Sequence, residues 1–107
     1  MKTVKQTFEE MPGTFQPEAA GGVDEVYQFD ITGAGGGKWY AQVKDRQCTV
    51  VEGEHEKPSL TITMGAADYL AMAEGRLNGQ VAYMTRKMKL KGNMLHAIKM
   101  NQIFKKK

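Results

Sequence analysis

Residues 78–104, NGQVAYMTRKMKLKGNMLHAIKMNQIF, change their hydrophobic period twice within one stretch. Asn78 and Asn93 each stand where an N-cap would begin a helix, because an asparagine side chain accepts hydrogen bonds from the free backbone amides there. Between the two predicted helices, Met88 and Leu90 alternate with lysines, which is the period of a strand with one covered face. The stretch therefore predicts a helix, a strand and a helix in that order.

Four segments upstream alternate between apolar and polar residues with the same period of two. The joins between them are short and rich in turn residues, which favours hairpins and consecutive strands that pair as a meander. Such a sheet has one covered face and one solvated face. The predicted strands are residues 26–32, 38–45, 47–53 and 59–65, followed by residues 87–92.

Helical periodicity marks both ends of the chain and the segment after the fourth strand. The predicted helices are residues 2–11, 66–75, 80–86 and 94–104. Together with five strands they give an α+β fold, in which helices cover one face of an antiparallel-rich sheet within a single domain, 1–107. The last helix is apolar nearly all round, which predicts burial on several sides, or else a surface that caps an opening or docks on a partner.

Composition and charge narrow the class of protein. The 107 residues suit one domain, and neither a secretory signal nor an apolar run of roughly 18 residues is visible. The lone cysteine, Cys48, fits a reducing cytoplasm. All 12 acidic residues lie at or before Glu74 together with 6 basic residues, whereas 9 basic residues and no acid follow it. This asymmetry suits an anionic membrane, an acidic partner or nucleic acid, or an attraction between the two halves of the fold.

Residues that carry chemistry do not assemble into a recognisable catalytic pattern. The glycine-rich segment 33–38 lacks the spacing of a P-loop and joins two predicted strands, which favours a flexible hairpin. His55 and His96 have no further ligands at metal-binding spacing. Cys48 lies mid-strand, where inert burial is expected. We therefore expect no catalytic residue, no metal and no cofactor, and we expect no nucleic-acid partner because no binding signature accompanies the basic residues.

The density of methionine in the quoted stretch raises a further question. Met84, Met88, Met94 and Met100 all fall within it. Thioether side chains adapt to ligands of varied shape but specify a rigid core poorly. The methionines therefore favour either an adaptable core or the wall of an apolar cavity.

The same stretch resembles the C-terminal signature of the sterol carrier protein type-two (SCP2-like) family. The matching positions are Ala82 and Tyr83, residues 87–90, residues 92–94, Ala97 and Lys99. Upstream, YQFDITGAGGGKWYAQVKD, VVEG and LTITMGAADYLAMAEGRLN resemble the rest of that domain in order and spacing. One departure is Thr85-Arg86, where members of the family usually have a polar residue, often Gln, followed by Gly.

This resemblance implies a stand-alone, prokaryotic-type lipid carrier in the cytoplasm, with helices enclosing a hydrophobic tunnel. The implied function is non-catalytic binding and transfer of a fatty acid, fatty acyl-CoA, phospholipid or sterol-like lipid. The expected lipid-binding residues are Phe8, Trp39, Met72, Leu77, Val81, Met84, Thr85, Met88, Leu90, Met100 and Phe104. The expected contacts with an anionic head group or a transiently bound anionic membrane are Arg86, Lys87, Lys89 and Lys91.

Two other classes of function stay open at the level of sequence. The apolar last helix fits an accessory subunit that docks on a partner enzyme, or a homodimer. An enzyme acting on lipid thioesters would need a reactive group in the cavity, and the sequence offers no activated nucleophile for that role. Lipid that co-purifies at about one molecule per chain would favour the carrier over both alternatives.

Overall fold

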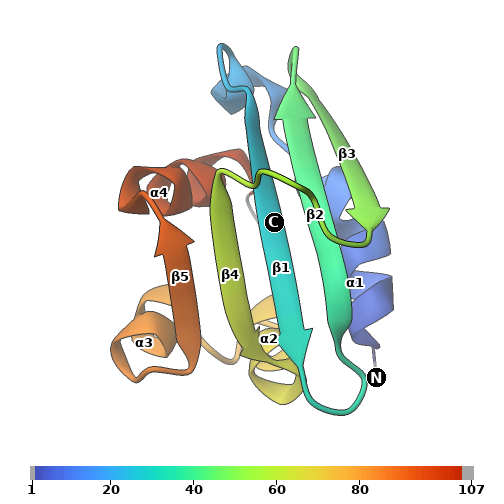
Figure 1. The fold of residues 1–107 in the computed structure, drawn as a ribbon, viewed down its shortest axis with the longest axis vertical. Helices are drawn as coiled ribbons and strands as arrows, with labels where there is room; N and C mark the ends of the chain where they lie inside the picture. The colour runs from blue at the N-terminus through green and yellow to red at the C-terminus, as the bar shows by residue number, and fades with distance from the viewer. Residues whose placement is uncertain (1, 105–107) are drawn as a thin grey trace.

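The computed structural model describes residues 2–104, which form a sheet with helices packed on it (Figure 1). The strands are β1 (Glu25–Thr32), β2 (Gly37–Lys44), β3 (Gln47–Glu52), β4 (Leu60–Gly65) and β5 (Met88–Gly92). The helices are α1 (Val4–Glu10), α2 (Ala66–Ala73), α3 (Gly79–Met84) and α4 (Met94–Ile103), with the 3₁₀ helices η1 (Met11–Thr14) and η2 (Pro17–Ala20). Every predicted strand and helix is confirmed, and its ends lie within two residues of the prediction.

The five-stranded sheet is mixed, in the order β3-β2-β1-β4-β5. The first three strands form the predicted antiparallel meander, and β4 pairs antiparallel with β5. However, β4 does not pair with β3. It lies parallel to β1 instead, with Phe29 opposite Ile62. The prediction of one continuous meander is therefore wrong at the β3–β4 connection, because residues 53–59 cross the sheet instead of turning back along its edge.

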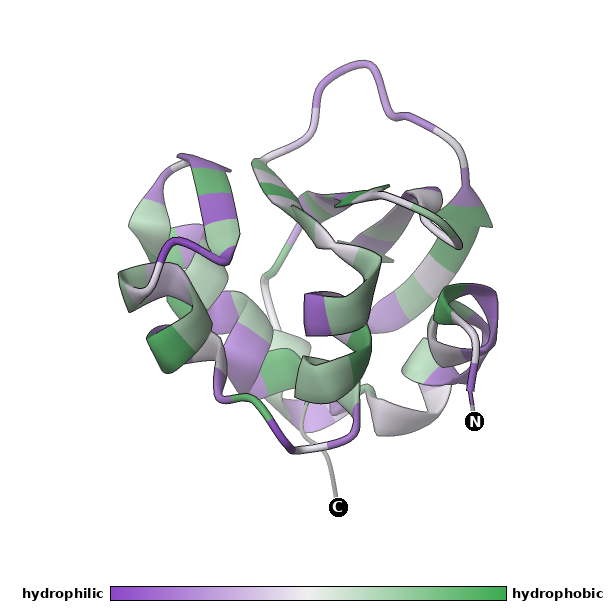
Figure 2. Ribbon diagram, turned by 90° about the horizontal axis from the view of Figure 1, so that it is seen from below, coloured by the Kyte–Doolittle hydropathy of each residue, from purple (hydrophilic) through white to green (hydrophobic). Residues whose placement is uncertain are grey.

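A buried amide holds this crossing segment, residues 53–59, against the sheet. Gln28 in the middle of β1 is 2% exposed. Its Oε1 accepts from the His55 backbone N at 2.8 Å, and its Nε2 lies 3.1 Å from the Gly53 carbonyl oxygen and 3.2 Å from that of Trp39. Figure 2 shows the crossing segment arching over the side of the sheet that faces away from the helices. The second face is therefore covered over β1. The prediction that this face is solvated is wrong at that place.

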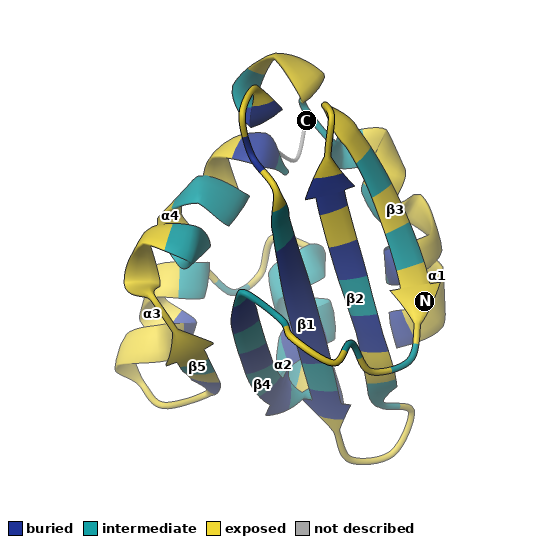
Figure 3. Ribbon diagram, turned by 45° about the horizontal axis from the view of Figure 1, so that its top comes forward, coloured by how far each residue is buried: buried dark blue, intermediate teal, exposed yellow. Residues whose placement is uncertain are grey.

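The face of the sheet under the helices carries the hydrophobic core (Figure 3). Phe8 of α1 stacks on Trp39 and Tyr69, with ring centroids 4.7 and 5.0 Å away. It also meets Phe29 edge-on at 5.1 Å. Aromatic pairs at such distances stabilise beyond the burial of their area. Thr3 and Gln6 form a capping box that starts α1. One ring thereby joins α1, α2 and the sheet.

The last helix, α4, is less buried than its composition predicts. Ile103 is fully buried, and Ala97 and Met100 are half-buried. In contrast, Leu95 and Ile98 are 67% and 52% exposed. The helix lies at the β5 edge of the molecule, so only one side of it packs against the protein (Figure 1). The prediction of burial on several sides is wrong, and an outward-facing apolar surface is the alternative that the structure contains.

Candidate functional site

A partly open cavity of about 760 Å³ lies where α1, η1 and α2 meet the C-terminal end of α4. Ligand sites in proteins commonly measure about 300–1,000 Å³ and combine mainly apolar walls with a few polar groups. The residues that line this cavity are Lys2, Gln6, Thr7, Glu10, Met11, Thr14, Tyr69, Met72, Ala73, Glu74 and Phe104. Their mixture of methionine, aromatic and charged side chains suits an elongated apolar ligand with one polar end.

The α2 wall of the cavity follows from helical spacing. Tyr69, Met72 and Ala73 are three and four residues apart, so they share one face of the helix. Burial raises the pKa of Tyr69 to about 12, and a hydrogen bond with the Thr7 side chain opposes part of this rise. Tyr69 therefore stays a neutral phenol at physiological pH, fixed by its stacking on Phe8. Met72 beside it has a flexible thioether, so this wall is rigid at one point and adaptable at the next.

The opposite wall comes from α1 and η1. Thr7 and Thr14 each donate their hydroxyl proton to the backbone carbonyl three residues earlier, at 2.6 and 2.8 Å. These hydroxyls can therefore offer a ligand only acceptor lone pairs. Gln6 accepts from the backbone N of Thr3 at 2.8 Å through its Oε1, which leaves its amide NH₂ group as the donor on this wall.

Phe104 closes the inner end of the cavity. It pairs with Phe15 in an isolated antiparallel bridge, with their rings 5.7 Å apart. Next to this bridge, the backbone N of Gln16 donates to the carbonyl oxygen of Ile103 at 2.7 Å. Phe104 also meets the buried ring of Tyr27 edge-on, with centroids 6.4 Å apart. These contacts fix Phe104 as a wall that is anchored to both the N-terminal segment and the sheet.

Charged groups stand at the rim of the cavity. The Lys2 Nζ lies 2.5 Å from Glu10 Oε1 on the α1 side, and the Arg76 Nη2 lies 2.6 Å from Glu74 Oε1 on the α2 side. Both members of the Lys2–Glu10 pair are 56% exposed in their side chains, and such surface pairs contribute only about 0–1 kcal/mol. The Lys2 ammonium can therefore exchange Glu10 for the anionic end of a ligand.

The structure brings two of the predicted lipid-binding residues, Met72 and Phe104, into this cavity. The other predicted residues divide between core and surface. Phe8, Trp39 and Met88 are buried in the core, Leu77, Leu90 and Met100 are half-buried against it, and Val81, Met84 and Thr85 are exposed on or beside α3. Phe8 and Trp39 also line a second, smaller pocket of about 180 Å³, so they remain candidate lipid-binding residues.

Several lining residues were missed by the sequence analysis. Lys2, Thr7, Met11 and Tyr69 all line the cavity. The spacing of Tyr69 and Met72 on one helix face is a signal that could have indicated Tyr69. Lys2 and Thr7 carry no such signal, because polar residues on a short N-terminal helix are expected to face solvent.

The backbone at the end of α3 shows why glycine is usual at the position that Arg86 occupies in this chain. Arg86 has φ 64°, in the left-handed region. Its backbone N donates to the Tyr83 carbonyl at 3.2 Å, and the backbone N of Lys87 donates to the Ala82 carbonyl at 2.8 Å. These two bonds define a Schellman motif, in which the left-handed position is usually glycine. A side chain there costs about 1–2 kcal/mol, so the arginine occupies this position at the expense of stability.

Reactive side chains do not gather at the cavity. Burial raises the pKa of Cys48 to about 11, so its thiol stays protonated at neutral pH, and it lies on β3 outside the cavity lining. Within residues 2–104, His, Cys, Asp and Glu do not cluster in groups of three or more that could hold a metal ion. None of the described helices is both long enough and apolar enough to cross a bilayer.

A five-stranded mixed sheet with helices on one face and an apolar cavity among them defines a small ligand-binding domain of the α+β class. The chain belongs to the SCP-2 sterol transfer family, a family of lipid-binding domains, whose sequence pattern matches residues 6–105.

Individual relatives agree with this assignment. Hydroxysteroid dehydrogenase-like protein 2 of Rattus norvegicus is 31% identical over 101 residues, which is 94% of this chain. The chain spans only 19% of the length of that relative and 21% of the Mus musculus protein of the same name. Among solved structures, palmitated SCP2L2 from Aedes aegypti superposes with a TM-score of 0.76 at 27% identity, over 94% of this chain and 93% of that one. Sterol carrier protein domain 2 of Helicoverpa armigera gives 0.71 at 29% identity, over 92% and 79%. The predicted fold class is confirmed.

Proposed function

We propose that the protein is a non-catalytic carrier that binds a single-chain lipid, such as a fatty acid or fatty acyl group, in the cavity between α1 and α2. The observation that carries this proposal is a cavity of about 760 Å³ in a chain of the SCP-2 family, with Met11, Met72 and Phe104 in its walls and Lys2 among its charged lining residues. The palmitated form of the Aedes aegypti relative supports a fatty acyl ligand. Phospholipids and sterol-like lipids are the other ligands to test.

In the proposed complex, the acyl chain lies against Met11, Met72 and Phe104, and Lys2 pairs with the carboxylate. Burying roughly 15 methylenes at about 0.8 kcal/mol each gives on the order of 12 kcal/mol before the losses of entropy and hydration. Micromolar affinity needs about 8 kcal/mol net, so about two thirds of this gross gain must remain after those losses. The two methionines let the walls adjust to chains of different length.

The proposal extends to the setting of the protein. We infer that residues 1–107 form one lipid-carrier domain, which acts in the cytoplasm and needs no cofactor. The lone Cys48, with its raised pKa, supports a reducing compartment and argues against a thiol nucleophile. Binding and transfer, without turnover of the lipid, are the expected activities.

An accessory subunit is the second candidate function. It is favoured by the exposed apolar residues of α4, which could dock on a partner enzyme or on a second copy of the chain. A lipid-free protein that refuses added fatty acid would support this alternative.

The experiment that tests the proposal is native mass spectrometry of the purified protein with and without added palmitate. Met72→Trp fills the cavity with an indole ring, and we expect it to weaken palmitate binding at least tenfold. Met84→Trp is the matched control, because Met84 is 71% exposed and outside the cavity lining. Ala73→Leu provides a smaller obstruction in case the tryptophan variant of Met72 does not fold.

The outcomes separate the hypotheses. One bound acyl chain that is lost in Met72→Trp and retained in Met84→Trp supports the cavity as the binding site. Equal loss in both variants, or binding unaffected by either cavity variant, would place the ligand elsewhere. A protein that binds neither palmitate nor acyl-CoA would refute the carrier function.

A further inference from the structure

Exposed apolar side chains are concentrated on two helices at one edge of the molecule. Among the described residues, six of the seven large apolar side chains that are exposed belong to α3 and α4. We define the α3–α4 face by these residues: Val81, Tyr83, Met84, Met94, Leu95 and Ile98. Figure 3 shows α3 mostly exposed and α4 as a mixture of exposed and intermediate residues, beside the largely exposed strand β5. Met84 and Leu95 are 71% and 67% exposed, which is unusual for side chains that prefer the interior.

The local geometry explains why these residues cannot be buried within the chain. On α3, Ala82 is buried, whereas its neighbours Val81 and Tyr83 point outward. On α4, the inward side is taken by Ile103 and by half-buried residues, which leaves Leu95 on the outer side. The α3–α4 face is therefore an unpartnered apolar surface within a fold that already has its own core.

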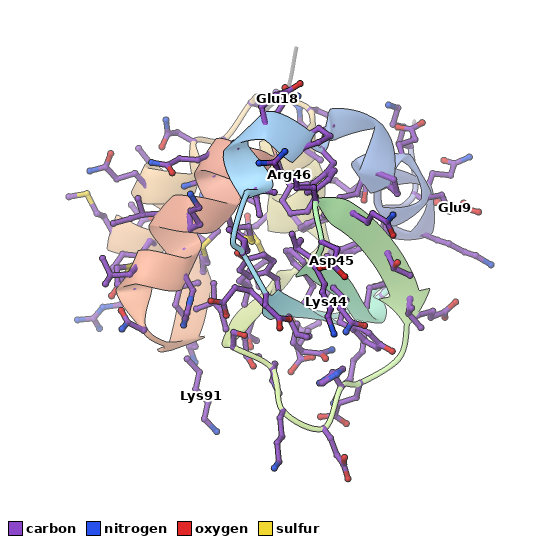
Figure 4. The ribbon with its side chains drawn as sticks, turned by 90° about the horizontal axis from the view of Figure 1, so that it is seen from above. Glu9, Glu18, Lys44, Asp45, Arg46 and Lys91 are labelled. Atoms are coloured by element: carbon purple, nitrogen blue, oxygen red, sulfur yellow. The ribbon has the colours of Figure 1, made fainter. Side chains whose placement is uncertain are left out.

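Cations border the α3–α4 face along the strand that joins the two helices. Arg86, Lys87, Lys89 and Lys91 are all exposed, and within the described part of the chain no ion pair holds any of them. Lys91 projects from the end of β5 beside α4, on the same side of the sheet as the crossing segment (Figure 4). No acidic residue follows Glu74 in the sequence, and the acidic side chain recorded beside α4 is that of Glu25 on β1, 3.3 Å from His96 Nδ1.

The strained backbone at Arg86 indicates that its side chain has a role on this face. The left-handed C′ position after α3 would be unstrained with glycine, yet it holds an arginine at φ 64°. Residues that keep a strained backbone conformation are concentrated at functional sites, where the side chain has a role beyond folding. Here that side chain adds a fourth cation next to the exposed Met84.

We propose that the α3–α4 face is a docking surface for an anionic lipid bilayer. Val81, Met84, Leu95 and Ile98 would enter the interfacial region, while Arg86, Lys87, Lys89 and Lys91 meet phosphate and carboxylate head groups. A fluid interface accommodates apolar side chains spread over two convex helices, whereas a folded acidic partner would need a groove of complementary shape. This surface does not depend on the ligand of the cavity. The face and the cavity are nevertheless connected through α4, because Phe104, directly after α4, lines the cavity.

The test is sedimentation of the full chain with vesicles of phosphatidylcholine alone or with 30% phosphatidylserine. We expect binding to the anionic vesicles only, weakened by salt because screening acts on exposed charges. Each lysine near an anionic surface contributes about fivefold, so Lys89→Gln with Lys91→Gln should weaken binding about 25-fold. Leu95→Gln should weaken it further. The matched controls are Lys44→Gln on β2 and Val51→Gln on β3, both exposed and outside the face.

Each other outcome overturns the proposal. Equal binding to neutral and anionic vesicles, or no binding to anionic vesicles, would show that the face does not dock on an anionic bilayer. Loss of binding in a variant with Lys105, Lys106 and Lys107 changed to Gln, without loss in Lys89→Gln/Lys91→Gln, assigns the contact to those three lysines. A dimer in analytical ultracentrifugation that Leu95→Gln dissociates, without vesicle binding, assigns the face to a second copy of the chain. Palmitate binding measured without vesicles should be unchanged in all face variants, so failure here is distinct from failure of the carrier function.

Discussion

The buried amide of Gln28 makes a prediction whose magnitude follows from its contacts. Gln28→Met keeps the length of the side chain and avoids a cavity, but it removes the hydrogen bonds that the side-chain amide makes to the crossing segment. The His55 backbone N and the carbonyl oxygens of Gly53 and Trp39 lose their partner in this variant. At about 1 kcal/mol for each bond, the free energy of unfolding should fall by about 3 kcal/mol. With an unfolding entropy of about 2.1 cal/mol/K per residue, this corresponds to a melting temperature about 13 °C lower.

The assay is urea unfolding followed by circular dichroism, with Gln42→Met as the matched control. Gln42 stands on β2 opposite Val26 in the same sheet but is exposed. We expect the control to change stability by less than about 0.5 kcal/mol. Hydrogen exchange at the His55 amide should accelerate in Gln28→Met and not in Gln42→Met. If the two variants differ by less than about 1 kcal/mol, the amide does not hold the crossing segment and the reasoning fails.

Three further predictions concern stability. Tyr27→Phe removes a buried hydroxyl that has no hydrogen-bond partner among the described residues. The free energy of unfolding should therefore stay constant or rise by up to about 1 kcal/mol. A decrease of more than about 1 kcal/mol in urea unfolding would contradict the unpartnered state. Burial, with Glu25 adding to it for Tyr27, raises the pKa of Tyr27 and Tyr69 to about 12 from 10, so the folded state keeps protons that the unfolded state releases. Stability should therefore fall between pH 10 and pH 12 by up to about 1.4 kcal/mol per pH unit for each tyrosine, and the double Tyr→Phe variant should flatten the measured curve; a wild-type curve that is already flat would refute this linkage. Arg86→Gly relieves the left-handed strain and should stabilise the fold by about 0.5–1 kcal/mol, whereas Arg86→Ala should not; equal effects of the two variants in thermal unfolding would count against strain at this residue.

The elements of the fold were predictable, but one strand pairing was not. Alternation located every strand because each of them places alternate residues on the covered face of the sheet. The same alternation is compatible with β4 beside β3 or beside β1, since the period of a strand says nothing about its neighbour. Gln28 lies within the predicted strand 26–32, but its alternation with apolar residues does not reveal that its side chain supplies hydrogen bonds to the backbone of the crossing segment. A segment of seven residues can turn or cross, and sequence alone does not distinguish the two.

The candidate site was predictable in part, for a related reason. Met72 and Phe104 were predicted as lipid-binding residues because they are large and apolar, and both line the cavity. Met84 was predicted for the same reason, but the orientation of α3 places Ala82 inward and leaves Met84 at the surface. Lys2 and Thr7 reach the cavity only because the capping box and the Phe8 stack set the orientation of α1. Such orientation is a property of packing between distant segments, which local periodicity does not encode.

The bridge between Phe15 and Phe104 has a consequence for biosynthesis. The cavity is walled by residues 2–14 at the start of the chain, by residues 69–74 in α2 and after it, and by Phe104 near the end. On the ribosome the first wall emerges roughly ninety residues before the last, so the cavity cannot close around a ligand until translation of the domain is nearly complete. A nascent chain of this sequence is therefore an empty and open form. The lipid of the proposed function can therefore enter the cavity only after Phe104 has joined the fold.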